Sequence, residues 1–136
     1  MNTALVVTGS VFVVIAAAIH LLIFFAESVL WSKPTTWKRF GLKTQQDADT
    51  VKPMAFNQGF YNLFLAIGAG VGLIMLGSNA CAQGGLVLSI FTTASMVLAA
   101  VVLMVSSPRL WRAALIQGVA PLLGIIFLAL APGLAG

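Results

Sequence analysis

Four long apolar stretches alternate with short polar connections along the chain. They cover about residues 5–27, 54–76, 86–106 and 113–131. Each is close to the ~20 residues that a helix needs to cross a ~30 Å hydrocarbon core. A backbone in lipid must satisfy its own hydrogen bonds, so each stretch is predicted to be helical. The predicted fold class is an all-α integral membrane protein, one domain over residues 1–136 built as a four-transmembrane-helix bundle.

The composition agrees with this interpretation. The chain is 60% hydrophobic and 7% charged, with a mean hydropathy of +1.07, whereas soluble domains carry about 25% charged residues. The first apolar stretch has no basic segment before it, and it exceeds the ~7–15 apolar residues of a signal peptide. We therefore expect it to stay in the mature protein as the first membrane span.

The basic residues are distributed unevenly. Five of the seven Lys and Arg residues lie between the first and second spans, two lie between the third and fourth, and residues 77–85 contain none. Because Lys and Arg accumulate in cytoplasmic loops, we predict that both termini are outside and that residues 28–53 form a cytoplasmic connection. The predicted location is a bacterial inner (cytoplasmic) membrane, crossed several times. This placement of charge argues against a nucleic-acid partner.

His20 and Glu27 are the ionisable residues of the first span, seven positions apart. Seven residues make almost two α-helical turns, so the two side chains are predicted to share one face. An ionisable group in a span is costly and usually faces a bundle interior or a wet cavity. We predict that His20 and Glu27 form a catalytic acid–base pair.

The second span begins with a polar sequence, FNQGFYN. Residues four apart share a helix face, and the topology brings this segment to the depth of His20 and Glu27. Ser95 is the inward residue expected from the third span. We predict a polar pocket in the cytoplasmic half of the bundle. Its ligand-binding residues are predicted to be Trp31, Asn57, Gln58, Tyr61, Asn62 and Gln117.

Simpler interpretations remain open for these residues. Glu27 could be a boundary carboxylate paired with Lys33, Lys38 or Arg112. His20 could make an interhelical hydrogen bond. Asn57 and Gln58 could cap the start of the second span, and Tyr61 could be an interfacial aromatic residue.

The connection between the first two spans is predicted to be interfacial. Trp31 and Trp37 suit the headgroup level, and a short polar helix or loop is expected to end at Pro53. One histidine and one carboxyl group are too few for a metal site, and no cofactor motif is present, so neither a metal nor a cofactor is predicted.

Small residues and a single thiol bear on assembly. Gly68 and Gly72 fit the small-xxx-small spacing that lets membrane helices approach closely. They are expected to pack within the bundle or to form a homo-oligomer contact. Cys81 is the only cysteine, so it is either a surface thiol or an intermolecular disulfide partner.

Two segments, IHLLIFFAESVLW and KPMAFNQGFYNLFLAIG, resemble a family of small bacterial four-span membrane proteins of unknown function. The matching pattern is I-H, F-x-x-E and W, followed by N-Q-G-x-Y-N. On this chain the pattern corresponds to His20, Glu27, Trp31, Asn57, Gln58, Gly59, Tyr61 and Asn62. The resemblance implies that these polar residues belong to the family, and it implies no activity.

Three functions fit the sequence. The first is a pocket that binds a small lipophilic or amphipathic molecule and could transform it by proton transfer. The second is a small proton-coupled multidrug-type exporter, which the strong charge bias and the position of Glu27 near the end of its span oppose. The third is a non-catalytic accessory membrane subunit.

Overall fold

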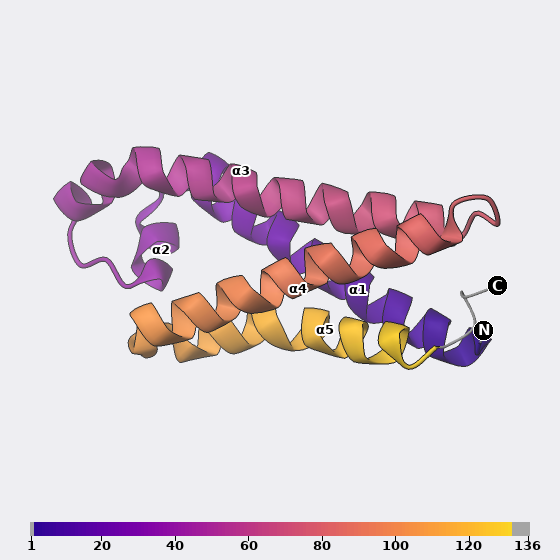
Figure 1. Cartoon of the computed structure of the whole chain (residues 1–136). Coiled ribbons are helices and arrows are strands. Elements are labelled where there is room, and N and C mark those ends of the chain that lie inside the picture. The colour runs from indigo at the N-terminus through magenta and orange to yellow at the C-terminus, as the bar shows by residue number, and fades with distance from the viewer. Residues whose placement is uncertain (1, 132–136) are drawn as a thin grey trace.

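The computed structural model describes residues 2–131, and the helices over this part of the chain run as four long rods, joined by two short turns and one longer connection (Figure 1). The first rod is α1, Thr3–Phe24, continued by the π-helical turn η1, Phe25–Val29. The second is α3, Gln45–Leu76, the third α4, Ala82–Ser106, and the fourth α5, Trp111–Ala129, preceded by the 3-10 turn η3, Pro108–Leu110. Four helices are therefore long and apolar enough to cross a membrane, as predicted.

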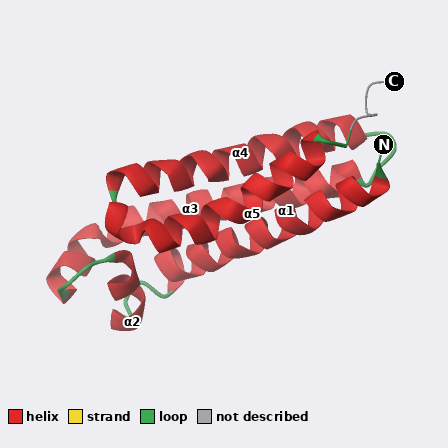
Figure 2. Cartoon of the chain, turned by 90° about the horizontal axis from the view of Figure 1, so that it is seen from below, coloured by secondary structure: helices red, strands yellow, loops and turns green. Residues whose placement is uncertain are grey.

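The four rods form a closed antiparallel ring. Contacts join α1 to α3, α3 to α4, α4 to α5 and α5 back to α1, while α1 and α4 touch little. Figure 2 shows the same bundle from a second direction, with no strand among the described residues. A small core runs along its axis, formed by Val13, Ala16, Ala69, Leu76, Met96, Ala120 and Leu128.

The two ends of the bundle differ in charge. The start of α1, the turn between α3 and α4 and the end of α5 lie at one end (Figure 1). The opposite end holds the connection between α1 and α3 and the turn between α4 and α5, and it carries all seven Lys and Arg residues. We call it the basic end. The predicted outside position of the C-terminus concerns residues 132–136, which lie outside the described part of the chain.

The connection at the basic end folds into a small compact unit. It contains α2, Pro34–Trp37, and the 3-10 turn η2, Lys38–Phe40. Trp31 and Trp37 are buried here against Ala48 and Ala55, and the Nε1 of Trp31 donates to the carbonyl oxygen of Ala48 at 2.9 Å. Both tryptophans therefore form a second small core in this unit, and their position at the headgroup level stays a prediction.

The second span begins earlier than predicted. Thr44 caps α3 by accepting a hydrogen bond from the backbone N–H of Asp47 at 3.1 Å. The helix then continues through Pro53, which was expected to end it. A proline leaves one carbonyl of the preceding turn without its helical partner, and here that carbonyl belongs to the exposed residue Asp49, where water can reach it. Asn57 and Gln58 consequently lie inside the helix and do not cap it.

Candidate functional site

The glycines of the second span are used inside the bundle. A methyl group at Gly72 would lie 2.5 Å from the Oγ of Ser89, and one at Gly68 would lie 2.6 Å from the Cγ2 of Thr92. Both glycines therefore pack against α4 of the same chain, which is the first of the two predicted roles, packing within the bundle. Assembly of several copies stays a prediction, and these two positions are already covered.

The third span presents different hydroxyl groups from the one expected. Ser89, Thr92 and Thr93 are buried, and Thr93 Oγ1 donates to the carbonyl oxygen of Ser89 at 2.6 Å. The predicted inward residue Ser95 is only half-buried, and its Oγ donates to the carbonyl oxygen of Phe91 in its own helix at 2.9 Å. The expectation for Ser95 was wrong because the face of α4 that meets α3 is set by Ser89 and Thr92.

His20 lies in the centre of the bundle and is fully buried. Its Nδ1 is 2.9 Å from the carbonyl oxygen of Ala16. A carbonyl oxygen can only accept, so Nδ1 carries a hydrogen and the Nε2 of a neutral ring is an acceptor. Among the described residues Nε2 has no hydrogen-bond partner. His20 therefore presents an unused polar atom to an apolar interior.

Gln117 lies at the level of His20 across the contact between α1 and α5. Gly9 packs against Leu128, and Val13 packs against Gly124, so in this antiparallel pair the two residue numbers add to 137. The same register places residue 20 opposite residue 117. His20 is seven residues from Val13, and Gln117 is seven residues from Gly124, so each lies on the same side of its helix as the residue that makes the contact. Gln117 is half-buried. The structure thus brings these two predicted residues to one depth, and no hydrogen bond joins them.

Glu27 lies in the π-helical turn η1, at the end of the first rod. The backbone N–H of Leu30 donates to the carbonyl oxygen of Phe25 at 2.8 Å, a five-residue spacing. The first rod therefore ends in a wider turn, and the shared face of His20 and Glu27 stays a prediction. The two residues are also about 10 Å apart along the axis, too far for direct proton transfer.

Asn62 is the partner of Glu27. Its Nδ2 donates to the Oε2 of Glu27 at 3.1 Å and to the carbonyl oxygen of Gln58 at 3.0 Å. Glu27 makes no ion pair with a described Lys or Arg, so the alternative of a carboxylate paired with a base finds no support there. The predicted convergence of the first two spans is therefore present as one hydrogen bond between half-buried side chains.

A close approach of the two helices makes this hydrogen bond reachable. Ser28 Oγ donates to the carbonyl oxygen of Phe56 in α3 at 2.9 Å. Gly59 faces this contact: a methyl group there would collide with Ser28 Oγ and lie 3.1 Å from the carbonyl oxygen of Phe24. A glycine at position 59 is thus required for the π-turn to lie against α3.

A groove opens beside Glu27 at the basic end, between the end of the first rod and the start of α3. Its volume is about 450 Å³. The lining side chains are Glu27, Ser28, Val29, Trp31, Ser32, Lys52, Pro53, Phe56 and Asn57. Trp31 and Asn57 were predicted site residues. Ser28, Ser32 and Lys52 were not predicted, although Ser28 is next to Glu27 and Lys52 is the last charge before the second apolar stretch.

Of the predicted site residues, Glu27, Trp31 and Asn57 line the groove, whereas His20, Gln58, Tyr61, Asn62 and Gln117 do not. Tyr61 has 58% of its surface exposed, and Gln58 is also exposed. The polar segment at the start of the second apolar stretch is helical, and only part of one face of it meets the first rod. Gln58 contributes its backbone carbonyl to Asn62 rather than its side chain.

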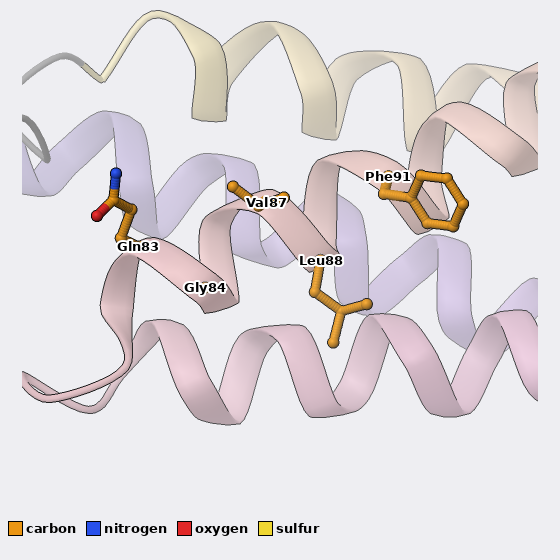
Figure 3. A pocket seen from close by; sticks show the side chains of 5 residues that line it. All are labelled: Gln83, Gly84, Val87, Leu88 and Phe91. Carbon is orange, nitrogen blue, oxygen red and sulfur yellow. The ribbon is translucent and has the colours of Figure 1, made fainter.

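A second depression lies on the outer side of α4, near the opposite end of the bundle (Figure 3). It has a volume of about 480 Å³ and is lined by Gln83, Gly84, Val87, Leu88 and Phe91. Gln83 is its single polar side chain, and Val87 and Phe91 are largely exposed. None of the predicted site residues lines it, and its apolar surface suits contact with lipid chains.

The fold defines a multi-pass, all-α membrane protein, and the comparisons with known proteins agree. The chain belongs to the family described as "protein of unknown function (DUF1304)", whose family model matches residues 14–129. This range includes His20, Glu27, Asn62 and Gln117, and it confirms the predicted resemblance to a small four-span family. No curated protein and no solved structure matches the chain.

Proposed function

We propose that this protein binds a small lipophilic or amphipathic molecule in the groove beside Glu27. The observation that carries the proposal is the Glu27–Asn62 hydrogen bond at the edge of a groove between two helices. A carboxyl group in a span is costly unless it has a partner or a function. One amide satisfies Oε2 and leaves Oε1 without a partner among the described residues.

The groove lies where an amphipathic molecule would reside. It is at the level at which the apolar stretch of α3 begins, and it combines polar groups with the exposed apolar side chains of Val29 and Phe56. Ligand sites commonly combine apolar walls with a few polar groups that fix orientation. In this proposal Glu27, which is held by its hydrogen bond from Asn62, orients the ligand, and Trp31 forms the adjoining wall.

His20 and Gln117 lie deeper in the bundle than this groove, so their part in the proposal is separate. The unpartnered Nε2 of His20 can accept a proton or a hydrogen bond. Because His20 and Glu27 are about two turns apart, any proton transfer between them must pass through the ligand or through water. The proposal therefore includes, as a second step, proton transfer to or from the bound ligand.

We further propose that the basic end faces the cytoplasm of a bacterial inner membrane, with both termini outside. All seven basic residues lie at that end, in accord with the positive-inside rule. The groove would then open towards the inner leaflet. An accessory role is less supported, because Gly68 and Gly72, its expected contact face, are covered by α4.

Native mass spectrometry of the mildly extracted protein tests ligand binding. We expect a discrete added mass on the wild type that is absent from Glu27→Gln. Asp49→Asn is the matched control, because Asp49 is an exposed acid outside the groove, and it should keep the added mass. An added mass that survives in Glu27→Gln and in Asn62→Ala would contradict the proposal.

A further inference from the structure

A proline in the middle of α5 leaves one backbone carbonyl without its helical partner. Pro121 lies inside this helix, and its side chain is fully buried. A proline has no N–H, so the carbonyl oxygen four residues earlier, that of Gln117, loses its donor. At Pro53 the corresponding carbonyl belongs to the exposed residue Asp49, where water can reach it. The carbonyl oxygen of Gln117 lies beside a buried ring in a membrane span, where lipid offers no donor.

The Nε2 of His20 lies at the level of this carbonyl. The register of α1 and α5, in which facing residue numbers add to 137, places residue 20 opposite residue 117 and residue 16 opposite residue 121. The ring of His20 covers the same two levels in α1, because its Nδ1 is 2.9 Å from the carbonyl oxygen of Ala16. Its Nε2 has no hydrogen-bond partner among the described residues. One contact between two helices therefore contains two polar atoms that lack donors.

These two atoms cannot satisfy each other. Nδ1 carries the hydrogen of the neutral His20 ring, so Nε2 is an acceptor, and a carbonyl oxygen is an acceptor as well. Two acceptors need a molecule that supplies two donors, and water has two O–H groups. The water oxygen can in turn accept from the side-chain amide of Gln117, which has two N–H donors. Three partners are the usual number for a buried water molecule.

The side chains at this level are small enough to admit a water molecule. Ala16 and Ala120 are buried here, and each side chain ends at its Cβ. A bridging water spans polar atoms about 5–6 Å apart, which is twice the length of a hydrogen bond. The axes of packed helices lie about 8–10 Å apart. A single water between the His20 ring and the backbone of α5 is therefore compatible with the packing of the two helices.

We infer that His20 and Gln117 hold one water molecule inside the bundle, between α1 and α5. The water donates to the Nε2 of His20 and to the backbone carbonyl oxygen of Gln117, and it accepts from the side-chain amide of Gln117. This inference goes beyond the proposed ligand groove and does not depend on it. It gives the buried imidazole a hydrogen-bonded partner with which the ring can exchange a proton.

Nuclear magnetic resonance of the full-length protein in deuterated detergent tests this bridge. His20 is the only histidine, so its ring signals are identified without ambiguity. At about pH 8, where an ordinary histidine is neutral, we expect Nδ1 to be the protonated nitrogen. We also expect a nuclear Overhauser cross-peak between water and Hδ2 of the ring. Hδ2 is bonded to carbon next to Nε2, and it lies far from the exchangeable hydrogen on Nδ1.

Two variants assign the contacts of the water. Pro121→Ala restores an N–H, which pairs with the carbonyl oxygen of Gln117 and removes one acceptor. Gln117→Leu keeps the backbone carbonyl and removes the amide donor. We expect each variant to weaken the water cross-peak several-fold, because one hydrogen bond corresponds to about a fivefold change in affinity. Pro53→Ala is the matched control: it restores the same kind of N–H in α3, below which the carbonyl of Asp49 is exposed, and it should leave the His20 cross-peak unchanged.

Three outcomes would overturn the inference. Protonation of Nε2 in place of Nδ1 would remove one of the two acceptors. A wild type without the cross-peak would exclude the water, as expected if the amide of Gln117 donates directly to Nε2. Both of these results come from the wild type, so they hold even if Pro121→Ala fails to fold. Equal weakening of the cross-peak in Pro53→Ala and Pro121→Ala would show that the signal has another origin.

Discussion

Gly59 determines how closely the π-turn of the first rod can approach α3. A methyl group at this position would collide with Ser28 Oγ and lie 3.1 Å from the carbonyl oxygen of Phe24. We expect Gly59→Ala to destabilise the protein by roughly 1–3 kcal/mol, the usual cost of overpacking. Thermal unfolding in detergent, followed by circular dichroism, measures the change.

Gly70→Ala provides the matched control for this substitution. Gly70 lies on the same helix, and a methyl group there would meet no atom within 4 Å. Alanine favours a helix over glycine by roughly 0.5–1 kcal/mol, so Gly70→Ala should leave stability unchanged or raise it slightly. Equal destabilisation by both substitutions would show that Gly59 has no special contact.

Ser28 and Gly59 should be energetically coupled. Ser28→Ala alone removes a hydrogen bond to the carbonyl oxygen of Phe56, at a cost of about 1 kcal/mol. In the Gly59→Ala background the same change also removes the colliding oxygen. The double variant should therefore lose less stability than the sum of the two single variants, by about 0.5 kcal/mol or more. Strictly additive losses in a double-mutant cycle would contradict this contact.

At the level of elements, the extension of α3 beyond the apolar span packs against the small core around Trp31, and we expect it to depend on that core. The Nε1 of Trp31 donates to the carbonyl oxygen of Ala48, and the ring packs against Phe40 at 5.2 Å between centroids. Trp31→Phe keeps an aromatic ring and removes the donor. We expect faster amide hydrogen exchange across residues 45–53, because the first turns of α3 lose a tertiary anchor.

Trp111→Phe is the control for this experiment. Trp111 is 47% exposed, and the guanidinium group of Arg112 lies over its ring at 5.3 Å from the centroid. Exchange across residues 45–53 should be unaffected in this variant. If Trp31→Phe also leaves exchange unchanged, the helix is maintained by its Thr44 cap and its own hydrogen bonds alone.

The elements show which features a sequence can predict. Four spans follow from apolar length, because a membrane imposes helices on such stretches. The π-turn at Phe25–Val29 could not be predicted, since it differs from an α-turn by one residue and depends on the contact of Ser28 with Phe56. The continuation of α3 through Pro53 is accompanied by a tertiary contact, the hydrogen bond from Trp31 to Ala48, which the sequence does not reveal.

The same distinction holds for the candidate site. The pairing of Glu27 with the polar segment of the second span was predictable, because two consecutive antiparallel spans place both at one depth. The outward position of Tyr61 was not predictable. The sequence shows that Asn57 and Tyr61 lie on one face of the helix, but only the position of the neighbouring helix decides whether that face meets lipid or protein. Lys52 was missed because it precedes the apolar stretch and its helix was expected to end at Pro53.

For the whole molecule, the unequal charge of the two ends predicts a single orientation in the membrane. A chain with seven basic residues at one end and none at the other should insert in one way. That orientation also decides which leaflet the groove beside Glu27 can sample. A dual-topology exporter would instead place the basic end on both sides in equal numbers, so orientation separates the two functions.

The single native cysteine makes this prediction directly measurable. Cys81 is exposed in the turn between α3 and α4, at the end opposite the basic residues. We expect it to react with a membrane-impermeant maleimide when the cytoplasmic membrane is intact. Lys43→Cys in a Cys81→Ser background places the thiol in an exposed position at the basic end, and it should react only after lysis. The reverse pattern would invert the topology, and partial labelling of both variants in intact cells would indicate dual insertion and favour the exporter.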